Sequence, residues 1–359
     1  MQNKEIELKF GFCGDALNLY SIFSNIGKVS DETDINLDNT YYDTDTRDFY
    51  SIRAGLRIRR SNDFSEQTLK IKGENIGGLH KRSEYNLPID PSAELPTLQK
   101  FPKEAFPENF DLEDIQSRLR SICRINFTRH LFNLEFMDST FEVAYDRGYI
   151  ETMEDFRHSL NELEIELKQT NVKPEEILNL FSILCTALAK ANLPLQLEPF
   201  SKMHRATLLQ KNTLPSIDIS CLDNSKHIVD YITSLVSVFE IIYGHFLVSH
   251  EVSLFSVNCT ILNLLLHSLK QLRHKNLFAF IIGRTEPVEY KEDLEVIIKL
   301  LKSFYQDCLD CRKKMIIGRL KGKTETVEKC VDKIRKSERQ NKMFMIPLKL
   351  RLLLSLIAK

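Results

Sequence analysis

The stretch Glu5-Ile6-Glu7-Leu8-Lys9 decides how the first half of the chain is interpreted. Charged and apolar residues alternate in it, which predicts a β-strand with one charged face and one apolar face. The stretch ELEIELK at 162–168 has the same alternation. Its charged face carries Glu162, Glu164, Glu166 and Lys168. Two strands that lie far apart in the sequence therefore crowd carboxylates on one face.

Three more stretches alternate in the same way, namely GLRIRR at 55–60, QTLKIKG at 67–73 and FEVAYDRG at 141–148. An antiparallel sheet with one solvated face explains any single one of them. Crowded glutamates repel one another unless cations offset their charge, and hard carboxylate oxygens suit Mg²⁺ or Mn²⁺. The arginines and lysines of the neighbouring strands suit a polyanion such as a phosphate chain.

Acids for a metal and bases for phosphate are needed together when a phosphoanhydride is cleaved. The sequence therefore predicts phosphoanhydride chemistry. It contains no G-x-x-x-x-G-K-[ST] phosphate loop, so an ordinary nucleotide-binding loop is excluded.

From about residue 220 the pattern changes from strands to helices. Stretches at 226–246, 253–272 and 291–315 show the helical spacing of apolar residues. A chain of 359 residues is expected to form two domains. We predict a strand-rich domain over 1–212 and an all-helical domain over 220–359, with TLPSIDIS at 213–220 as the linker.

The composition excludes several classes of protein. With 49 basic and 50 acidic side chains, the formal net charge of −1 does not indicate a nucleic-acid binder. The most apolar stretch, Ile228 to Val248, contains Asp230 and Glu240, which fits a buried helix better than a membrane span. The N-terminus lacks the apolar region of a signal peptide, so a cytoplasmic protein is expected. The eight cysteines are scattered, which predicts free thiols.

The motifs of residues 1–205 resemble the CYTH, or triphosphate tunnel metalloenzyme, family. The resemblance rests on an ordered set: E-x-E-x-K at 5–9, YYDT at 41–44, GLRIR at 55–59, TLKIKG at 68–73, GGLHKRSEYN at 77–86, FEVAYDRG at 141–148, ELEIELK at 162–168 and SKMHR at 201–205. It implies an α+β fold in which a closed eight-stranded antiparallel β-barrel with flanking helices precedes an all-α domain. The charged strand faces would line a tunnel, and helices would cover the apolar outer faces.

The chain also resembles the bacterial branch in which a helical CHAD domain follows the barrel. Members of that branch resemble inorganic triphosphatases. Here the second half carries only scattered histidines and basic residues, so it is CHAD-like by position and helicity, in a degenerate form. The resemblance implies inorganic triphosphate or a related triphosphate as substrate and polyphosphate as a partner of the helical domain. The charge balance and the composition predict no nucleic acid or membrane as partner.

Carried over residue by residue, the resemblance implies roles for the charged side chains. The acids expected to bind Mg²⁺ or Mn²⁺ are Glu5, Glu7, Glu162 and Glu164. The bases expected to bind phosphate are Lys9, Arg57, Arg59, Lys70, Arg82, Arg118, Arg129 and Lys202. Further matching acids are Glu84, Glu142, Asp146 and Glu166. Glu5, Glu162 and Lys9 are expected to act in catalysis, in which a metal-activated water attacks.

Two positions depart from the family pattern. Asn86 stands at the last place of R-x-E-x-E, and SKMHRAT replaces a more usual SKA followed by arginine and glycine. Arg129 shares its strand parity with Phe127 and Leu131, so the pattern alone leaves its direction open.

The resemblance implies hydrolysis of inorganic triphosphate to pyrophosphate and phosphate, and it leaves alternatives open. The same barrel could act as a thiamine or nucleoside triphosphatase or as a class IV adenylyl cyclase. A non-catalytic polyphosphate-binding protein is a further alternative, but binding alone requires bases and not paired acids. Because every matched motif precedes residue 212, residues 1–212 alone are expected to fold and to hydrolyse triphosphate.

Overall fold

The computed structural model describes residues 3–13, 18–71, 73–76, 79–153, 157–210, 222, 227–274 and 288–357. Its strands are β1 (Asn3–Phe12), β2 (Lys28–Asp43), β3 (Gly55–Arg60), β4 (Ser65–Lys70), β5 (Glu74–Ile76), β6 (Leu79–Pro88), β7 (Arg120–Phe136), β8 (Ser139–Thr152), β9 (Arg157–Thr170) and β10 (Leu195–Leu197). The helices among and just after the strands are α1 (Leu19–Phe23), α2 (Asp48–Ser51), α3 (Leu112–Ser117), α4 (Ile177–Lys190) and α5 (Lys202–Gln210). The later helices are α6 (Ile228–Ser249), α7 (Val252–His274), α9 (Val288–Leu320), α10 (Thr324–Gln340) and α11 (Ile346–Ile357). Short 3₁₀ turns are η1 (Leu98–Lys100), η2 (Lys103–Ala105), η3 (Pro174–Glu176) and η4 (Met343–Met345).

Eight of the strands close into an antiparallel barrel, as the sequence predicts. Their order is β1-β9-β8-β7-β2-β3-β4-β6, and β6 pairs with β1 to complete the ring. β1 closes the barrel because its first half pairs with β6, at Glu5↔Arg82, while its second half pairs with β9, at Lys9↔Glu164. The short strands β5 and β10 extend the sheet beside this ring.

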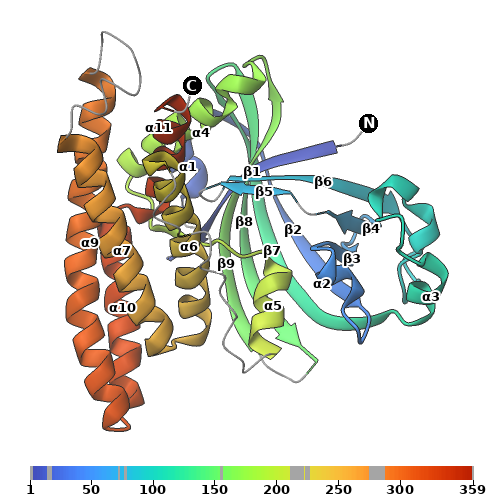
Figure 1. The fold of residues 1–359 in the computed structure, drawn as a ribbon. Helices are drawn as coiled ribbons and strands as arrows, with labels where there is room; N and C mark the ends of the chain where they lie inside the picture. Colours follow the sequence, from blue (N-terminus) through green and yellow to red (C-terminus); the bar gives the residue numbers. More distant parts are fainter. Residues whose placement is uncertain are drawn as a thin grey trace.

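The inside of the barrel has a charged part and an apolar part. The charged faces of β1, β3, β4, β6 and β9 point inward, where their side chains line one cavity. Further along the strands the inner faces are apolar. This inner apolar cluster contains Leu37, Tyr41, Cys123, Ile125, Phe127, Ile150, Leu160 and Ala206. Ala206 belongs to α5, which contacts β7 and β8 (Figure 1). Helix α5 therefore packs on the apolar part of the interior.

The apolar strand faces point outward, as expected, and are covered on two sides. On one side α2, α3, η1 and η2 cover β3, β4 and β6, with Phe49, Leu56 and Leu69 in the shared cluster. On the other side the outer faces of β1, β8 and β9 form one large core with α4 and the C-terminal helices. In this core Phe10 of β1 meets Phe344 of η4 edge to face, with ring centroids 5.2 Å apart.

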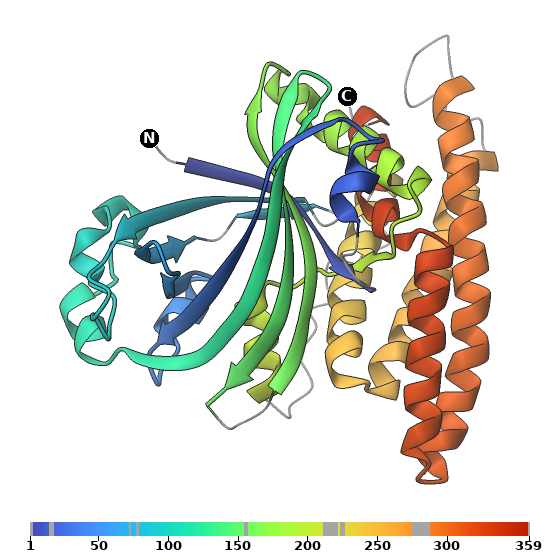
Figure 2. The same ribbon diagram turned by 180° about the vertical axis from the view of Figure 1, so that it is seen from behind.

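The C-terminal helices lie along one side of the barrel (Figures 1 and 2). Helix α6 packs against α7, α7 against α9, and α9 against α10. By length and composition α6 and α7 could cross a membrane, but 67% and 61% of their apolar windows are buried within the protein. Such burial is typical of core helices, in agreement with the interpretation of Ile228 to Val248. The predicted linker at 213–220 lies outside the described residues.

Two helices also lie within the strand-rich half. Helix α1 covers Leu19–Phe23, and residues 14–17 before it lie outside the described residues. After Pro174 the chain forms the turn η3 and continues as α4 to Lys190. The seven cysteines in the described residues are free thiols.

Candidate active site

A cavity of about 850 Å³ occupies the charged part of the barrel. Most of the predicted site residues line it. They are Glu5, Glu7, Lys9, Arg57, Arg59, Lys70, Arg82, Glu84, Arg129, Glu142, Glu164, Glu166 and Lys202. Glu162 and Asp146 are fully buried beside it and contact lining residues. These residues, from seven strands and helix α5, therefore converge on one cavity.

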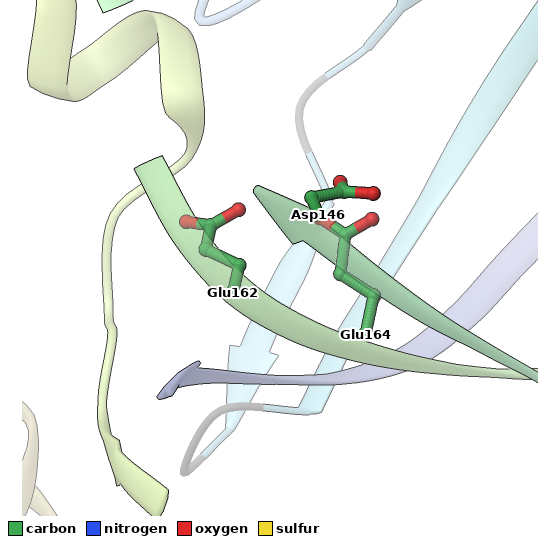
Figure 3. Close-up of side chains that lie close together, drawn as sticks. All are labelled: Asp146, Glu162 and Glu164. Atoms are coloured by element: carbon green, nitrogen blue, oxygen red, sulfur yellow. The ribbon is translucent and has the colours of Figure 1, made fainter. Parts of the chain in front are cut away.

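Three carboxylates form the tightest acidic group of this site. Asp146 comes from β8, and Glu162 and Glu164 come from the neighbouring strand β9 (Figure 3). Ligand oxygens of the three side chains lie within 4.8 Å of one another. The register explains this, because Asp146 pairs directly with Glu162, and Glu164 follows two residues later on the same face. The sequence predicts Glu162 and Glu164 as metal ligands and places Asp146 only among further acids.

Basic side chains bind this acidic group directly. The Lys202 ammonium lies 2.9 Å from Asp146 Oδ2, 2.5 Å from Glu162 Oε2 and 2.6 Å from Glu164 Oε1. Arg129 donates two hydrogen bonds of 2.7 Å to Asp146 and one of 2.7 Å to Glu164. Burial would raise the pKa of Glu164, but Lys202 and Arg129 outweigh it and hold that pKa well below its usual range. Burial also opposes ionisation of Glu162, but Arg205, Lys202 and Lys9 outweigh it and lower the pKa of Glu162, so the bases hold both acids of β9 in the ionised form.

Arg205 also bonds Glu162, although the sequence predictions do not include it. Its guanidinium is buried and contacts Glu198 at 3.1 Å as well. The motif SKMHR contained a usable signal. Arg205 follows Lys202 by three residues, and this spacing places both side chains on one face of α5.

A second group of charges lies on β1, β4 and β6. Arg82 donates to Glu5 at 2.7 Å and to Glu7 at 2.9 Å. Lys70 lies 2.9 Å from both Glu5 and Glu84. Burial and the nearby charges of Glu5 and Glu164 raise the pKa of Glu7 to about 8, despite the opposing effect of Arg82. Glu7 therefore retains a proton at neutral pH as long as no further cation is bound.

Three more bases face the cavity with weaker carboxylate contacts. The Arg57 guanidinium lies 3.5 Å from Glu84. Arg59 donates to the Asn39 side chain at 2.9 Å, and burial together with Arg57 and Arg129 lowers the pKa of Arg59 to about 10. Lys9 donates to the backbone carbonyl of Phe200, and its ammonium lies 4.0 Å from Glu162.

Arg118 requires a correction, because the structure does not bring it to the cavity. It ends helix α3, is 38% exposed, and bonds Asp114 and Asp48. It precedes the first residue of β7, so no strand carries its side chain inward.

Arg129 does point inward, although Phe127 and Leu131 share its parity. The reason is that the inner face of β7 is itself partly apolar, and Phe127 belongs to the inner apolar cluster.

The other acids and Asn86 lie toward the edge of the site. Lys168 lies 2.8 Å from Glu166 and 3.4 Å from Glu142, and both acids are partly exposed. Asn86 lines the cavity and accepts a hydrogen bond of 2.8 Å from the Thr68 hydroxyl. Asn86, where the family pattern has an acid, therefore keeps this part of the cavity wall polar.

One wall of the cavity was missed by the sequence predictions. Phe200 and His204 stack with ring centroids 4.5 Å apart, and His245 lies edge to face with Phe200 at 4.9 Å. His245 and Ile241 belong to α6, so the C-terminal helices contribute to the cavity. Isolated histidines and aromatic residues on helices carry no spacing signal, because this wall forms only when α6 packs on the barrel.

The donor set fits divalent cations. Asp146, Glu162 and Glu164 offer clustered carboxylate oxygens, and a positively charged ammonium already occupies the space among them. Hard oxygen donors of this kind suit Mg²⁺ or Mn²⁺. The surrounding arginines and lysines can bind phosphate oxygens with charge-assisted hydrogen bonds.

Comparison with known proteins agrees with this arrangement. The family model of the CYTH domain matches residues 3–206, which is more than half of the chain. An inorganic triphosphatase from Haemophilus influenzae is 35% identical over 149 residues, which cover 40% of this chain and 40% of that protein. The match thus spans less than half of that relative.

Solved structures show weaker likenesses. A putative adenylyl cyclase from Hippeastrum, described as having a dominant triphosphatase activity, is 18% identical, covers 59% of this chain and 97% of its own, and gives a TM-score of 0.43. A protein from Pyrococcus horikoshii is 20% identical, covers 58% of this chain and 99% of its own, and gives a TM-score of 0.35.

Proposed function

This chain belongs to the CYTH domain family, and on that premise we propose that it hydrolyses inorganic triphosphate to pyrophosphate and phosphate. The observation that carries the proposal is the buried array of opposite charges inside the barrel. Acids from β1, β6, β8 and β9 and bases from β1, β3, β4, β6, β7, β9 and α5 line one cavity. The inorganic triphosphatase of Haemophilus influenzae supports the same substrate, although it is matched over only part of its length.

Divalent metal ions fit the acids of this site. We assign their binding to Asp146, Glu162 and Glu164, together with Glu5 and Glu7. When bound, Mg²⁺ or Mn²⁺ would neutralise phosphoryl oxygens and lower the pKa of a water molecule that attacks the phosphorus.

The chain's own bases would bind and orient the triphosphate. Arg57, Arg59 and Arg129 present guanidinium groups that match the spacing of phosphate oxygens. Lys70, Arg82 and Lys202 now pair with carboxylates, and they become available to phosphate when cations take their place on the acids. Enclosure in the barrel strengthens each of these contacts, because they form away from bulk water.

The second half of the chain is proposed as a separate domain over 220–359, after the barrel domain over 1–212. Its CHAD-like character, polyphosphate binding and the cytoplasmic location of the protein remain predictions from the sequence. The described helices share a hydrophobic core with the barrel, and this contact supports a role in stabilising the site.

A substrate panel tests the proposed reaction. Phosphate release is measured with inorganic triphosphate, ATP, thiamine triphosphate, pyrophosphate and long polyphosphate, each with Mg²⁺ and with Mn²⁺. We expect the highest kcat/KM for inorganic triphosphate. Faster turnover of ATP or thiamine triphosphate would replace the proposal with one of the related activities. Tight binding of polyphosphate without turnover of any substrate would indicate a non-catalytic protein.

A further inference from the structure

His80 lies in the cavity beside the acids of β1 and has no role in the site described so far. It is 8% exposed and lines the cavity. Its Nε2 atom is fully buried and has no hydrogen-bond partner among the residues that the structure describes. A buried polar atom left without a partner is unfavourable, so a ligand that satisfies it contributes favourably.

The register of the barrel places His80 directly opposite a carboxylate. His80 of β6 pairs with Glu7 of β1, and Arg82 pairs with Glu5 on the same inward face. Side chains directly opposite each other in an antiparallel pair have Cβ atoms about 4.5–5.5 Å apart. The next pair along, Glu5 with Arg82, makes a direct contact of 2.7 Å across the same two strands. His80 and Glu7 are thus neighbours on the inward face of the barrel, and both residues line the cavity.

We propose that His80 binds, through Nε2, a divalent metal ion held by the acids of the cavity. The proposal rests on the metal-dependent function proposed above. The position favours metal over phosphate, because the residue opposite His80 is an acid rather than a base. Phosphate already has nearby donors in Lys9, Lys70 and Arg82. Carboxylates alone suit Mg²⁺, whereas an added imidazole nitrogen favours transition metals such as Co²⁺ and Ni²⁺.

Pulsed electron paramagnetic resonance of bound Mn²⁺ tests the proposal on the full-length protein. A nitrogen ligand produces electron spin-echo modulation from ¹⁴N, and this readout is independent of turnover. We expect ¹⁴N modulation in the wild-type protein and its replacement by a ¹⁵N signal when the protein contains ¹⁵N-histidine. We further expect the modulation to be lost in His80→Gln and kept in His204→Gln and His245→Gln, the other histidines of the cavity.

Metal titrations provide the matching affinities. In His80→Gln the affinity for Co²⁺ should fall by at least roughly tenfold, while the affinity for Mg²⁺ should change much less. The isotope experiment needs no substitution, so it stands even if His80→Gln fails to fold. Bound Mn²⁺ without nitrogen modulation, or modulation that survives in folded His80→Gln, would overturn the role of His80 and leave the proposed function intact. An absence of Mn²⁺ binding would overturn both.

Discussion

Among the single residues of the site, Lys202 lies at the centre of the acidic group formed by Asp146, Glu162 and Glu164. Its ammonium lies within 2.9 Å of one oxygen each from Asp146, Glu162 and Glu164. Burial would lower the pKa of Lys202, but the charges of Glu162, Glu164 and Asp146 outweigh it and raise that pKa far above its usual range. A divalent ion bound to the same oxygens would repel this ammonium strongly. On the proposed function, Lys202 would therefore compete with the metal in the free protein and would bind phosphate when the metal is present.

The substitution Lys202→Gln tests this competition. We expect Mn²⁺ affinity to rise by roughly tenfold or more, because the competing ammonium is removed. Triphosphate affinity should fall by roughly tenfold, because a charge-assisted phosphate contact is lost. Calorimetric titration of each ligand measures both effects. Lys168→Gln, at the exposed edge of the cavity, is the matched control and should change Mn²⁺ affinity little. Equal changes of Mn²⁺ affinity in Lys202→Gln and Lys168→Gln would contradict the proposed competition between Lys202 and the metal.

The acids of β9 offer a second comparison on one strand face. Glu162→Gln and Asp146→Asn should each lower triphosphate hydrolysis by roughly 100-fold or more, since even indirect changes at metal sites cost about 10–100-fold. Glu166→Gln, four residues from Glu162 on the same face, should have a much smaller effect, because Glu166 is partly exposed and bonds Lys168. Steady-state rates of triphosphate hydrolysis with saturating Mg²⁺ measure these effects. A wild-type rate in Asp146→Asn would show that Asp146 is not a metal ligand.

Single residues also mark the limits of prediction from the sequence. Alternation placed Glu5, Glu7 and Glu164 on charged strand faces, the family resemblance implied that these faces line a tunnel, and the three side chains line the cavity. Asp146 was under-rated, because its closeness to Glu162 depends on the register between β8 and β9. Arg118 was misplaced, because a family position says nothing about where a strand begins. His80 gave no signal, because one histidine inside a strand has no periodicity.

Among the helices and strands, α6 approaches the barrel so closely that one of its positions requires glycine. A Cβ atom on Gly244 would lie 2.6 Å from Pro199 Cγ and 2.7 Å from the Phe200 ring. Both neighbours are rigid rings that cannot rotate away easily. Phe200 in turn stacks on His204 and accepts the hydrogen bond of Lys9 through its carbonyl. The contact of α6 therefore positions one wall of the cavity.

Gly244→Ala should destabilise the protein by roughly 1–2 kcal/mol. Overpacking costs about 1–3 kcal/mol, and the two close contacts with rigid rings place Gly244→Ala in the upper part of that range, from which the better helix propensity of alanine subtracts about 1 kcal/mol. Urea unfolding measures the change. Gly11→Ala is the control, because its added Cβ would meet Gln196 at an ordinary 3.5 Å. A Gly244→Ala protein as stable as the wild type would show that α6 does not pack as tightly as described.

Glu338 of α10 links three elements and predicts a pH dependence of stability. It is fully buried and accepts hydrogen bonds from the Leu197 backbone N–H at 2.5 Å and the Tyr243 hydroxyl at 2.7 Å. Burial raises the pKa of Glu338 from 4.5 to about 7, although its hydrogen bonds oppose the shift. The folded protein thus holds this proton more tightly than the unfolded chain. The resulting stabilisation is full below about pH 4.5 and is lost as the pH rises to about 7.

The loss of stability from Glu338 between pH 4.5 and pH 7 is on the order of 3 kcal/mol. Glu338→Gln resembles the protonated acid, so it should be more stable than the wild type at pH 8 and similar to it at pH 5. Thermal unfolding of both proteins across this range provides the measurement. Parallel pH profiles for the two proteins would show that Glu338 does not titrate in this range.

Elements were predicted unevenly from the sequence. Strands β1, β3, β4, β8 and β9 were found because each has one charged and one apolar face. The long strands β2 and β7 were not assigned from their residues. The first half of β2 is largely exposed, and its run KVSDETDINL lacks clear alternation because neither of its faces belongs to a deep core.

In the molecule as a whole, the barrel and the C-terminal helices share one hydrophobic core. Leu8, Phe10 and Ile165 on the outer barrel face are buried together with side chains of α6, η4 and α11. Ile241 and His245 of α6 also line the cavity. These contacts change the expectation that residues 1–212 fold and hydrolyse triphosphate alone. Without the helices, several large apolar side chains become exposed, and each costs about 1.5–3 kcal/mol.

We therefore expect a protein of residues 1–212 to unfold at a clearly lower temperature than the full chain, to associate in solution, and to hydrolyse triphosphate poorly. Thermal unfolding, light scattering and phosphate release measure these properties side by side. A monomeric truncated protein with the melting temperature and rate of the full chain would restore the expectation from the sequence.

The closed barrel with its inward charges was predictable as a whole because alternation and motif order act together over 205 residues. The packing of α6 on the cavity was not, because it depends on contacts between residues more than 40 positions apart. What the cavity does is decided most directly by phosphate release from inorganic triphosphate, measured on the full-length protein after exhaustive chelation and again with Mg²⁺ or Mn²⁺ restored. We predict no release in chelator, recovery with either metal, and no recovery in Glu162→Gln. Undiminished release in chelator, or no release with either metal, would contradict the account.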